Sequence, residues 1–264
     1  MALVNRMLIW MHRRELRGRN RLHQLFVRSL GPWPLLTVTS KYGPQLLINP
    51  HEYVDAYILR YGFYESEVFE ALKPFFTAGG VFWDIGSNTG IHGLSAKFLF
   101  PQLDVVCFEP VPSLADRILA GARLNHLSIT LCATALSDAP GAVWMDVTPG
   151  NLGMSQVVDH RAAGGPALLS AATTADALVA SGRIPAPNFI KIDVEGSELR
   201  VLQGMSSILA GGSVKAIAIE AGPDFLQTTE HPYRRILDAA GFQFTRLNRV
   251  EPTEHNLDNY LGVR

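Results

Sequence analysis

The chain has 264 residues, of which 47% are hydrophobic and 18% are charged, and its formal net charge is −1. This composition supports a sizeable core and argues against disorder, while the balanced charge indicates no nucleic-acid partner. No apolar run approaches the roughly 18–20 residues of a membrane-spanning helix, and polar residues interrupt the N-terminus too early for a secretory signal. We therefore expect a cytoplasmic protein.

Residues 1–76 are expected to form an N-terminal extension of a basic helix, a hairpin and a cap segment. Residues 1–50 carry a net charge of +7, against −8 for the rest of the chain. A basic amphipathic helix over residues 1–30 either packs on the protein or contacts a membrane or another anionic surface peripherally. Two apolar runs within residues 35–50, separated by Gly43 and Pro44, predict a β-hairpin. Residues 52–76 predict a helix.

Residues 77–264 are predicted to form an α/β domain with a Rossmann-like fold. Helical stretches alternate with five apolar runs, which are VFWDI, LDVVCFE, SITLCATAL, NFIKIDV and VKAIAIEA. This alternation indicates a mostly parallel sheet with helices on both faces. The closing segments GFQFTRLNRV and NLDNYLGVR suit an antiparallel pair at the sheet edge. Between the third and fourth strands, WMDVT and SQVVDH predict an additional hairpin.

The first strand of this domain runs into a glycine-containing loop, VFWDIGSNTG. Such a loop lies at the edge of a parallel sheet where ligands bind. The dinucleotide fingerprint needs a glycine where this loop has Asn88, and Asp84 would repel a pyrophosphate. A carboxylate suits a cationic ligand without phosphates, and S-adenosylmethionine has an ammonium and a sulfonium. We therefore assign cofactor binding to Asp84, Gly86, Ser87, Asn88 and Gly90.

The next two strand ends also carry acids. Glu109 follows the second strand 19 residues beyond Gly90, close to the spacing of about 20 at which an acid accepts hydrogen bonds from ribose hydroxyls. The third strand runs into Ser137 and Asp138, where a carboxylate can accept from the adenine amino group; the alternative is a simple turn before Pro140. One acid at each of three strand ends predicts a nucleoside-binding site.

These motifs resemble those of the FkbM-type methyltransferases. The resemblance is carried by VFWDIGSNTG, VVCFEPVPS, ALSD and above all FIKIDVEGSELRVLQGM, and it covers about Tyr64 to Arg264. Ala175 departs from the family pattern, which has a leucine there. The resemblance implies a class I methyltransferase fold, with a seven-stranded sheet whose C-terminal strand is antiparallel. It also implies S-adenosylmethionine-dependent methylation of a hydroxyl on a sugar, polyketide or similar small molecule.

Methyl transfer to a hydroxyl generally needs a group that removes the hydroxyl proton. Asp193 and Glu195 follow the fourth strand, and His92 lies in the first helical turn after the glycine loop, so these three residues are the candidate catalytic groups. Several acids in one cleft raise the pKa of at least one of them, which suits a base. As an alternative, Asp193 and Glu220 would hold Mg²⁺ that acidifies the acceptor hydroxyl, although a site without metal is favoured.

Two other functions stay open on the sequence. A dinucleotide-dependent oxidoreductase would use the same type of sheet, although Asp84 and Asn88 oppose it. A non-catalytic cofactor-binding or membrane-docked protein would use the basic N-terminus as its working surface. The oligomeric state and the acceptor have no motif that identifies them.

Overall fold

The computed structural model describes residues 35–147, 152–158, 167–249 and 257–264. The helix expected over residues 1–30 lies outside the described residues, as does its expected contact with a membrane or another anionic surface. None of the described helices is both long and apolar enough to cross a membrane.

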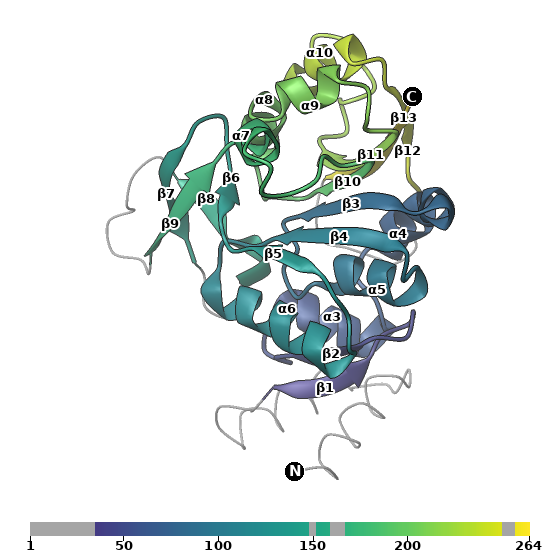
Figure 1. Cartoon of the computed structure of the whole chain (residues 1–264), viewed down its shortest axis with the longest axis vertical. Helices are drawn as coiled ribbons and strands as arrows, with labels where there is room; N and C mark the ends of the chain where they lie inside the picture. Colours follow the sequence, from purple (N-terminus) through teal and green to yellow (C-terminus); the bar gives the residue numbers. More distant parts are fainter. Residues whose placement is uncertain (1–34, 148–151, 159–166, 250–256) are drawn as a thin grey trace.

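A seven-stranded sheet forms the centre of the protein, in the order β12-β13-β11-β10-β3-β4-β5 (Figure 1). Among these described strands, β13 alone runs in the direction opposite to the other six. This is the class I methyltransferase topology expected from the sequence. The strands are β3 (Gly80–Ile85), β4 (Leu103–Phe108), β5 (Thr130–Cys132), β10 (Phe189–Ile192), β11 (Ala216–Ala221), β12 (Gln243–Arg246) and β13 (Asp258–Val263).

Helices cover both faces of this sheet, as the alternating pattern predicts (Figure 1). One face carries α5 (Ile91–Leu99) and α6 (Pro112–Leu124). The other carries α7 (Ala175–Ala180), α8 (Glu198–Gln203), α9 (Ser206–Ala210) and α10 (Pro232–Ala239). Because side chains alternate along a strand, Phe82 packs in the core on the first face and Trp83 in the core on the second.

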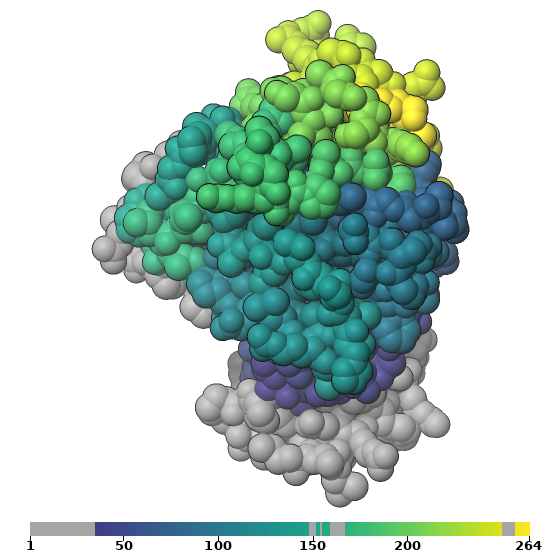
Figure 2. Space-filling model, viewed as in Figure 1, coloured from purple at the N-terminus to yellow at the C-terminus, as the bar shows by residue number. Residues whose placement is uncertain are grey.

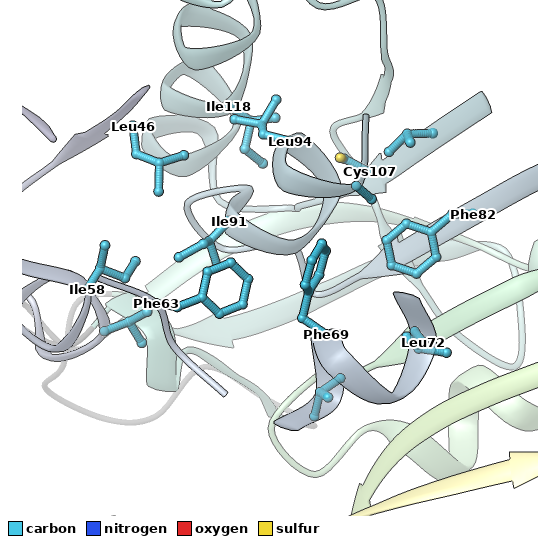
Figure 3. Close-up of a cluster of buried hydrophobic side chains, with 14 of the residues drawn as sticks. Leu46, Ile58, Phe63, Phe69, Leu72, Phe82, Ile91, Leu94, Cys107 and Ile118 are labelled. Atoms are coloured by element: carbon cyan, nitrogen blue, oxygen red, sulfur yellow. The ribbon is translucent and has the colours of Figure 1, made fainter. Parts of the chain in front are cut away.

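The predicted N-terminal hairpin is present and is part of the first core. Strands β1 (Leu36–Thr39) and β2 (Gln45–Ile48) pair antiparallel. Figure 3 shows Leu46 of β2 in the same cluster as Leu94 of α5 and Ile118 of α6. The described part of the N-terminal segment therefore shares a core with the sheet domain, and the boundary at residue 76 remains a prediction.

The helix predicted over residues 52–76 is not continuous. It consists of α3 (Tyr53–Tyr61), α4 (Ser66–Leu72) and the 3-10 helix η1 (Lys73–Ala78). Gly62 ends α3 with a left-handed φ of 84°, and its N–H is bonded to Ile58 O. Glu65 is also left-handed, with φ 52°. These two reversals turn the chain, so that α4 begins in a new direction next to the carboxyl ends of the strands.

A second, four-stranded sheet projects from the side of the main sheet, in the order β6-β9-β7-β8 (Figures 1 and 2). The predicted hairpin is β7 (Gly141–Asp146) paired with β8 (Gln156–Val158), and the short 3-10 helix η2 (Leu152–Met154) precedes β8. The third predicted strand is divided, because β6 (Ala135–Leu136) leaves the main sheet and pairs with β9 (Ala167–Thr173). The second sheet thereby lies beside the carboxyl ends of β4 and β5.

Candidate active site

The glycine loop after β3 is held between the neighbouring strand ends. The backbone N–H groups of Gly86 and Ser87 both donate to Phe108 O, at 3.1 and 3.0 Å. Gly86 has a φ of 77°, and a Cβ there would lie 1.8 Å from Asp193 O. Glycine is thus required by both the left-handed backbone and the close approach to the β10 end. The backbone of Asn88 is left-handed as well, with φ 52°. Gly90 immediately precedes α5.

Asp84 lies beneath this loop rather than in a cavity. Its side chain is 0% exposed, Oδ2 accepts from Gly93 N at 2.9 Å, and Lys191 Nζ is 4.0 Å from Oδ1. Burial raises its pKa, while Lys191 opposes the shift. Asp84 lines none of the three cavities described below. The direct cofactor contact expected for Asp84 stays a prediction. The contacts that the Asp84 side chain makes in the structure connect α5 to Lys191.

Glu109 faces the first of these cavities, at the end of β4. Its two carboxyl oxygens accept from Asn88 N at 2.8 Å and from Val111 N at 2.9 Å. Each oxygen therefore keeps a second lone pair for a ligand hydroxyl. Burial raises the pKa of Glu109 to about 7. The acid predicted to bind a ribose is held in place by the glycine loop and the start of α6.

The first cavity lies across the carboxyl ends of β3, β4 and β10. Part of its lining is polar and contains Gly86, Asn88 and Glu109. Another part is apolar, and the residues there are Val111, Leu114, Leu136, Met145 and Val157. A cavity that combines hydrogen-bonding groups with an apolar wall matches a nucleoside in polarity.

Ser137 and Asp138, which were predicted to contact adenine, do not line this cavity. Ser137 Oγ donates to Asp138 Oδ1 at 2.9 Å. The carbonyl of Ser137 packs against Gly204, where a Cβ would lie 2.0 Å from it. The apolar wall comes instead from Leu136 and Met145, which the sequence patterns did not identify. The one signal for Met145 was its place in an insertion between the third and fourth strands.

Two further cavities adjoin the first. The second includes Tyr53, Tyr64 and His92 in its lining, and the third includes Tyr64, Gln156 and Glu220. Asp193 and Glu195 line all three cavities. The structure therefore places these two predicted catalytic carboxyl groups where the cavities meet.

The turn that carries these two carboxyl groups is fixed by Glu198. Glu198 Oε1 accepts from Val194 N at 3.1 Å and Gly196 N at 3.2 Å, and Tyr233 Oη donates to Oε2 at 3.1 Å. Glu195 adopts a left-handed φ of 53°, which is uncommon for glutamate and is characteristic of functional loops. The tightly bonded turn stabilises this conformation.

Asp193 and Glu195 differ in their electrostatic surroundings. Asp193 Oδ2 accepts from Lys191 Nζ at 3.0 Å, and this buried lysine also lies 3.5 Å from Gly86 O. The neighbouring acids raise the pKa of Lys191 despite its burial. Burial and the charge of Asp193 raise the pKa of Glu195 to about 8. One carboxyl group thus has a lysine partner, while the other has a pKa suited to accepting a proton near neutral pH.

Glu220 and Glu65 extend this acidic region. Burial and nearby acids raise the pKa of Glu220 to about 9, although Arg249 Nη2 donates to its Oε1 at 3.1 Å. Burial raises the pKa of Glu65 to about 7, and Asn259 Nδ2 donates to Glu65 Oε1 at 2.9 Å. In the described part of the chain, no group of three or more His, Cys, Asp or Glu residues is arranged to hold a metal ion. Mg²⁺ between Asp193 and Glu220 is an alternative that the structure leaves untested.

His92 is buried, with 3% exposure, at the edge of the second cavity. Its Nε2 lies 3.4 Å from Glu65 O, and its ring packs edge-on against Phe63 at 5.1 Å between centroids. Burial lowers the pKa of His92 well below its usual value, and Lys191 lowers it further. The imidazole is therefore neutral and weakly basic, which makes His92 a less suitable proton acceptor than Glu195.

Comparison with known proteins agrees with this geometry. The family model described as "Methyltransferase FkbM domain" matches residues 84–244. Hexuronic acid methyltransferase AglP of Haloferax volcanii is 30% identical over 189 residues, which cover 71% of this chain and 74% of that protein.

Two solved structures are among those similar to this chain. Protein PH0793 of Pyrococcus horikoshii has a TM-score of 0.51 and 8% identity, covering 93% of this chain and 82% of that one. Methyltransferase FkbM of Methylobacillus flagellatus has a TM-score of 0.49 and 18% identity, covering 72% of this chain but 44% of that one. The family match spans more than half of the chain and includes the glycine loop, Glu109 and the KIDVEG segment. The chain belongs to the FkbM methyltransferase family.

Proposed function

We propose that this methyltransferase uses S-adenosylmethionine to methylate a hydroxyl group on a sugar or a related polyhydroxylated small molecule. The observation that carries the proposal is that Asp193 and Glu195 line both the first cavity, beside Glu109, and the two cavities next to it. A donor in the first cavity and an acceptor in a neighbouring one would therefore meet at these carboxyl groups. The similarity to a hexuronic acid methyltransferase supports a sugar as the acceptor.

The described residues fit S-adenosylmethionine. The apolar part of the first cavity suits adenine, and the unused lone pairs of Glu109 suit the ribose hydroxyls. Carboxyl groups outnumber cations around the cavities: the ion pairs described here involve Lys191 and Arg249, whereas the acids are Glu65, Asp84, Glu109, Asp193, Glu195 and Glu220. A ligand with an ammonium and a sulfonium would favour ionisation of these acids, whereas the pyrophosphate of a dinucleotide would oppose it.

When bound, the cofactor supplies an electrophilic methyl group on its sulfonium. Glu195 would accept the proton of the acceptor hydroxyl at its carboxylate when that hydroxyl is methylated. Asp193, which pairs with Lys191 at 3.0 Å, would face positive charge at the donor end. His92 and Phe63 close the inner wall beside Glu65, which limits the access of water.

The test is Glu195→Gln, which removes the proton acceptor with little change in side-chain size. We expect kcat to fall by about 10²–10⁴-fold while the Kd for S-adenosylmethionine changes much less. Since the base acts in its ionised form, wild-type kcat should rise as the pH passes through about 8, the pKa of Glu195. Asp224→Asn removes an exposed acid after β11 and serves as the matched control. Wild-type turnover by Glu195→Gln would rule out this base.

The remaining expectations are separate proposals with their own tests. Calorimetry with NAD and with S-adenosylmethionine distinguishes the oxidoreductase alternative, since only the favoured cofactor should bind. Liposome flotation of the full chain, with neutral and anionic vesicles, tests peripheral contact through residues 1–30. Absence of flotation on anionic vesicles would rule out the membrane-docked alternative. A cytoplasmic location remains a prediction from the sequence.

A further inference from the structure

We infer that Glu52 is a positioning residue for the methyl donor, because it holds the short helix η2 in place as part of the wall of the first cavity. This role rests on the proposed function, since it takes the first cavity as the donor site. Residue 52 lies outside the family match, which begins at residue 84. The N-terminal segment thereby takes part in cofactor binding, in addition to its place in the core.

The helix η2 packs directly against the glycine loop. Leu152 and Gly153 line the first cavity, and Gly153 also lines the second. A Cβ on Gly153 would lie 2.7 Å from Asn88 Nδ2 and 2.8 Å from Val54 Cγ2, so the helix is in close contact with both the loop and α3. Asn88 N in turn donates to Glu109 Oε2, on the acid proposed to bind the ribose. The position of η2 therefore helps to set the shape of the donor cavity.

Glu52 joins η2 to the start of α3. Its Oε2 accepts from Leu152 N at 2.7 Å, across 100 residues of sequence, and the residue is 8% exposed. Glu52 occupies the N-cap position of α3, yet its side chain accepts no hydrogen bond from the described backbone of its own helix. N-cap residues are usually short polar side chains that bond to their own helix. The longer glutamate side chain is directed to a different segment instead.

The loss of this bond would act on the placement of η2 more than on its folding. The turn is closed from within, because Ser155 Oγ donates to Leu152 O at 2.7 Å and Ser155 N donates to the same oxygen at 3.2 Å. Without Glu52 these two bonds remain, while the attachment to α3 is lost. A smaller fraction of molecules then has the complete cavity wall, and the apparent affinity for the donor falls by that fraction.

Calorimetric titration of the full chain with S-adenosylmethionine tests this role. Glu52→Ala removes the acceptor, and its Kd should be at least about fivefold higher than that of the wild type. Glu52→Gln loses the charge but keeps an acceptor oxygen for Leu152 N, so its Kd should stay within about twofold of the wild type. Asp116→Ala, which removes an exposed acid that is not among the cavity residues, should also stay within about twofold.

Amide hydrogen exchange separates the placement of η2 from general stability. In Glu52→Ala, exchange should become faster in peptides that cover residues 152–158 and stay unchanged in β3, whereas Glu52→Gln should match the wild type in both. Unchanged exchange in residues 152–158, or equally faster exchange in β3, would overturn the positioning role.

The titrations also distinguish this role from the proposed function. If the wild type binds S-adenosylmethionine and Glu52→Ala binds it with a Kd less than about fivefold higher, the positioning role alone is wrong. An equal loss of affinity in Glu52→Gln would overturn it too, because the effect would then come from charge. Failure of the wild type to bind S-adenosylmethionine overturns the proposed function, and the role of Glu52 with it.

Discussion

Replacing Glu109 by glutamine is the sharpest test of how the cofactor is held. Glu109 is 5% exposed, and its two oxygens accept backbone hydrogen bonds of 2.8 and 2.9 Å. Glutamine has a single acceptor oxygen, so its amide NH₂ must face one backbone N–H of Asn88 or Val111. It also has one acceptor fewer for the two ribose hydroxyls.

The two losses appear in different measurements. The lost backbone bond exists with or without ligand and should lower the free energy of unfolding by about 1.5–3 kcal/mol. The lost bond between a ribose hydroxyl and a charged acceptor, also about 1.5–3 kcal/mol, should weaken S-adenosylmethionine binding by roughly 10–150-fold. Since burial raises the pKa of Glu109 to about 7, wild-type affinity should increase from about pH 6 to about pH 8, as the carboxyl group ionises. The variant should show a flatter pH profile.

Calorimetric titration with S-adenosylmethionine and chemical denaturation separate the two effects. Asp104→Asn, an exposed acid on the same strand, is the control and should change neither quantity. If Glu109→Gln binds S-adenosylmethionine within about threefold of the wild type, the assignment of Glu109 to the ribose is wrong. An equal loss in Asp104→Asn would attribute the effect to net charge instead.

Three further predictions concern the folding of the site. Gly86→Ala would place a Cβ 1.8 Å from Asp193 O, so it should lower the free energy of unfolding by at least about 3 kcal/mol more than Gly182→Ala. Gly182 also has a positive φ, but a Cβ there would have no atom within 4 Å. Similar losses in the two variants, measured by denaturant unfolding, would contradict the close-packing argument. Lys191→Met should lower the free energy of unfolding by about 3–5 kcal/mol, because it leaves Asp84 buried and unpaired. Adding Asp84→Asn should recover much of that loss. No recovery would show that the Lys191–Asp84 pair is not the cause of the destabilisation. Folding raises the pKa of four buried or half-buried glutamates, Glu65, Glu109, Glu195 and Glu220, from an ordinary 4.5 to between about 7 and about 9, so the folded state holds more protons than the unfolded chain in this range. The melting temperature of the ligand-free protein should therefore fall as the pH rises from about 4.5 to about 9, and a rising melting temperature would refute the charge assignment.

Local patterns were sufficient for the architecture. The alternation of apolar runs and helical stretches predicted the α/β sheet, and the hairpin around Gly43 was correctly placed, because side-chain periodicity and turn chemistry act between near neighbours. The same patterns missed the break at Gly62 and Glu65 and the departure of β6 from the main sheet. Both features depend on contacts with distant segments, which override local helix and strand preference.

The sequence by itself determined that acids follow consecutive parallel strands and that Asp193 and Glu195 share one turn. Only the tertiary structure decided which acids face the cavities. The side chain of Asp84 lies under the loop, in contact with Gly93 N and Lys191, whereas Glu109 faces the first cavity. Leu136 and Met145 of the second sheet line that cavity, whereas Ser137 and Asp138 do not, and Arg249 reaches Glu220 from 29 residues away. The orientation and charge state of each acid depend on partners and burial that are remote in sequence, and these exist only once the chain has folded.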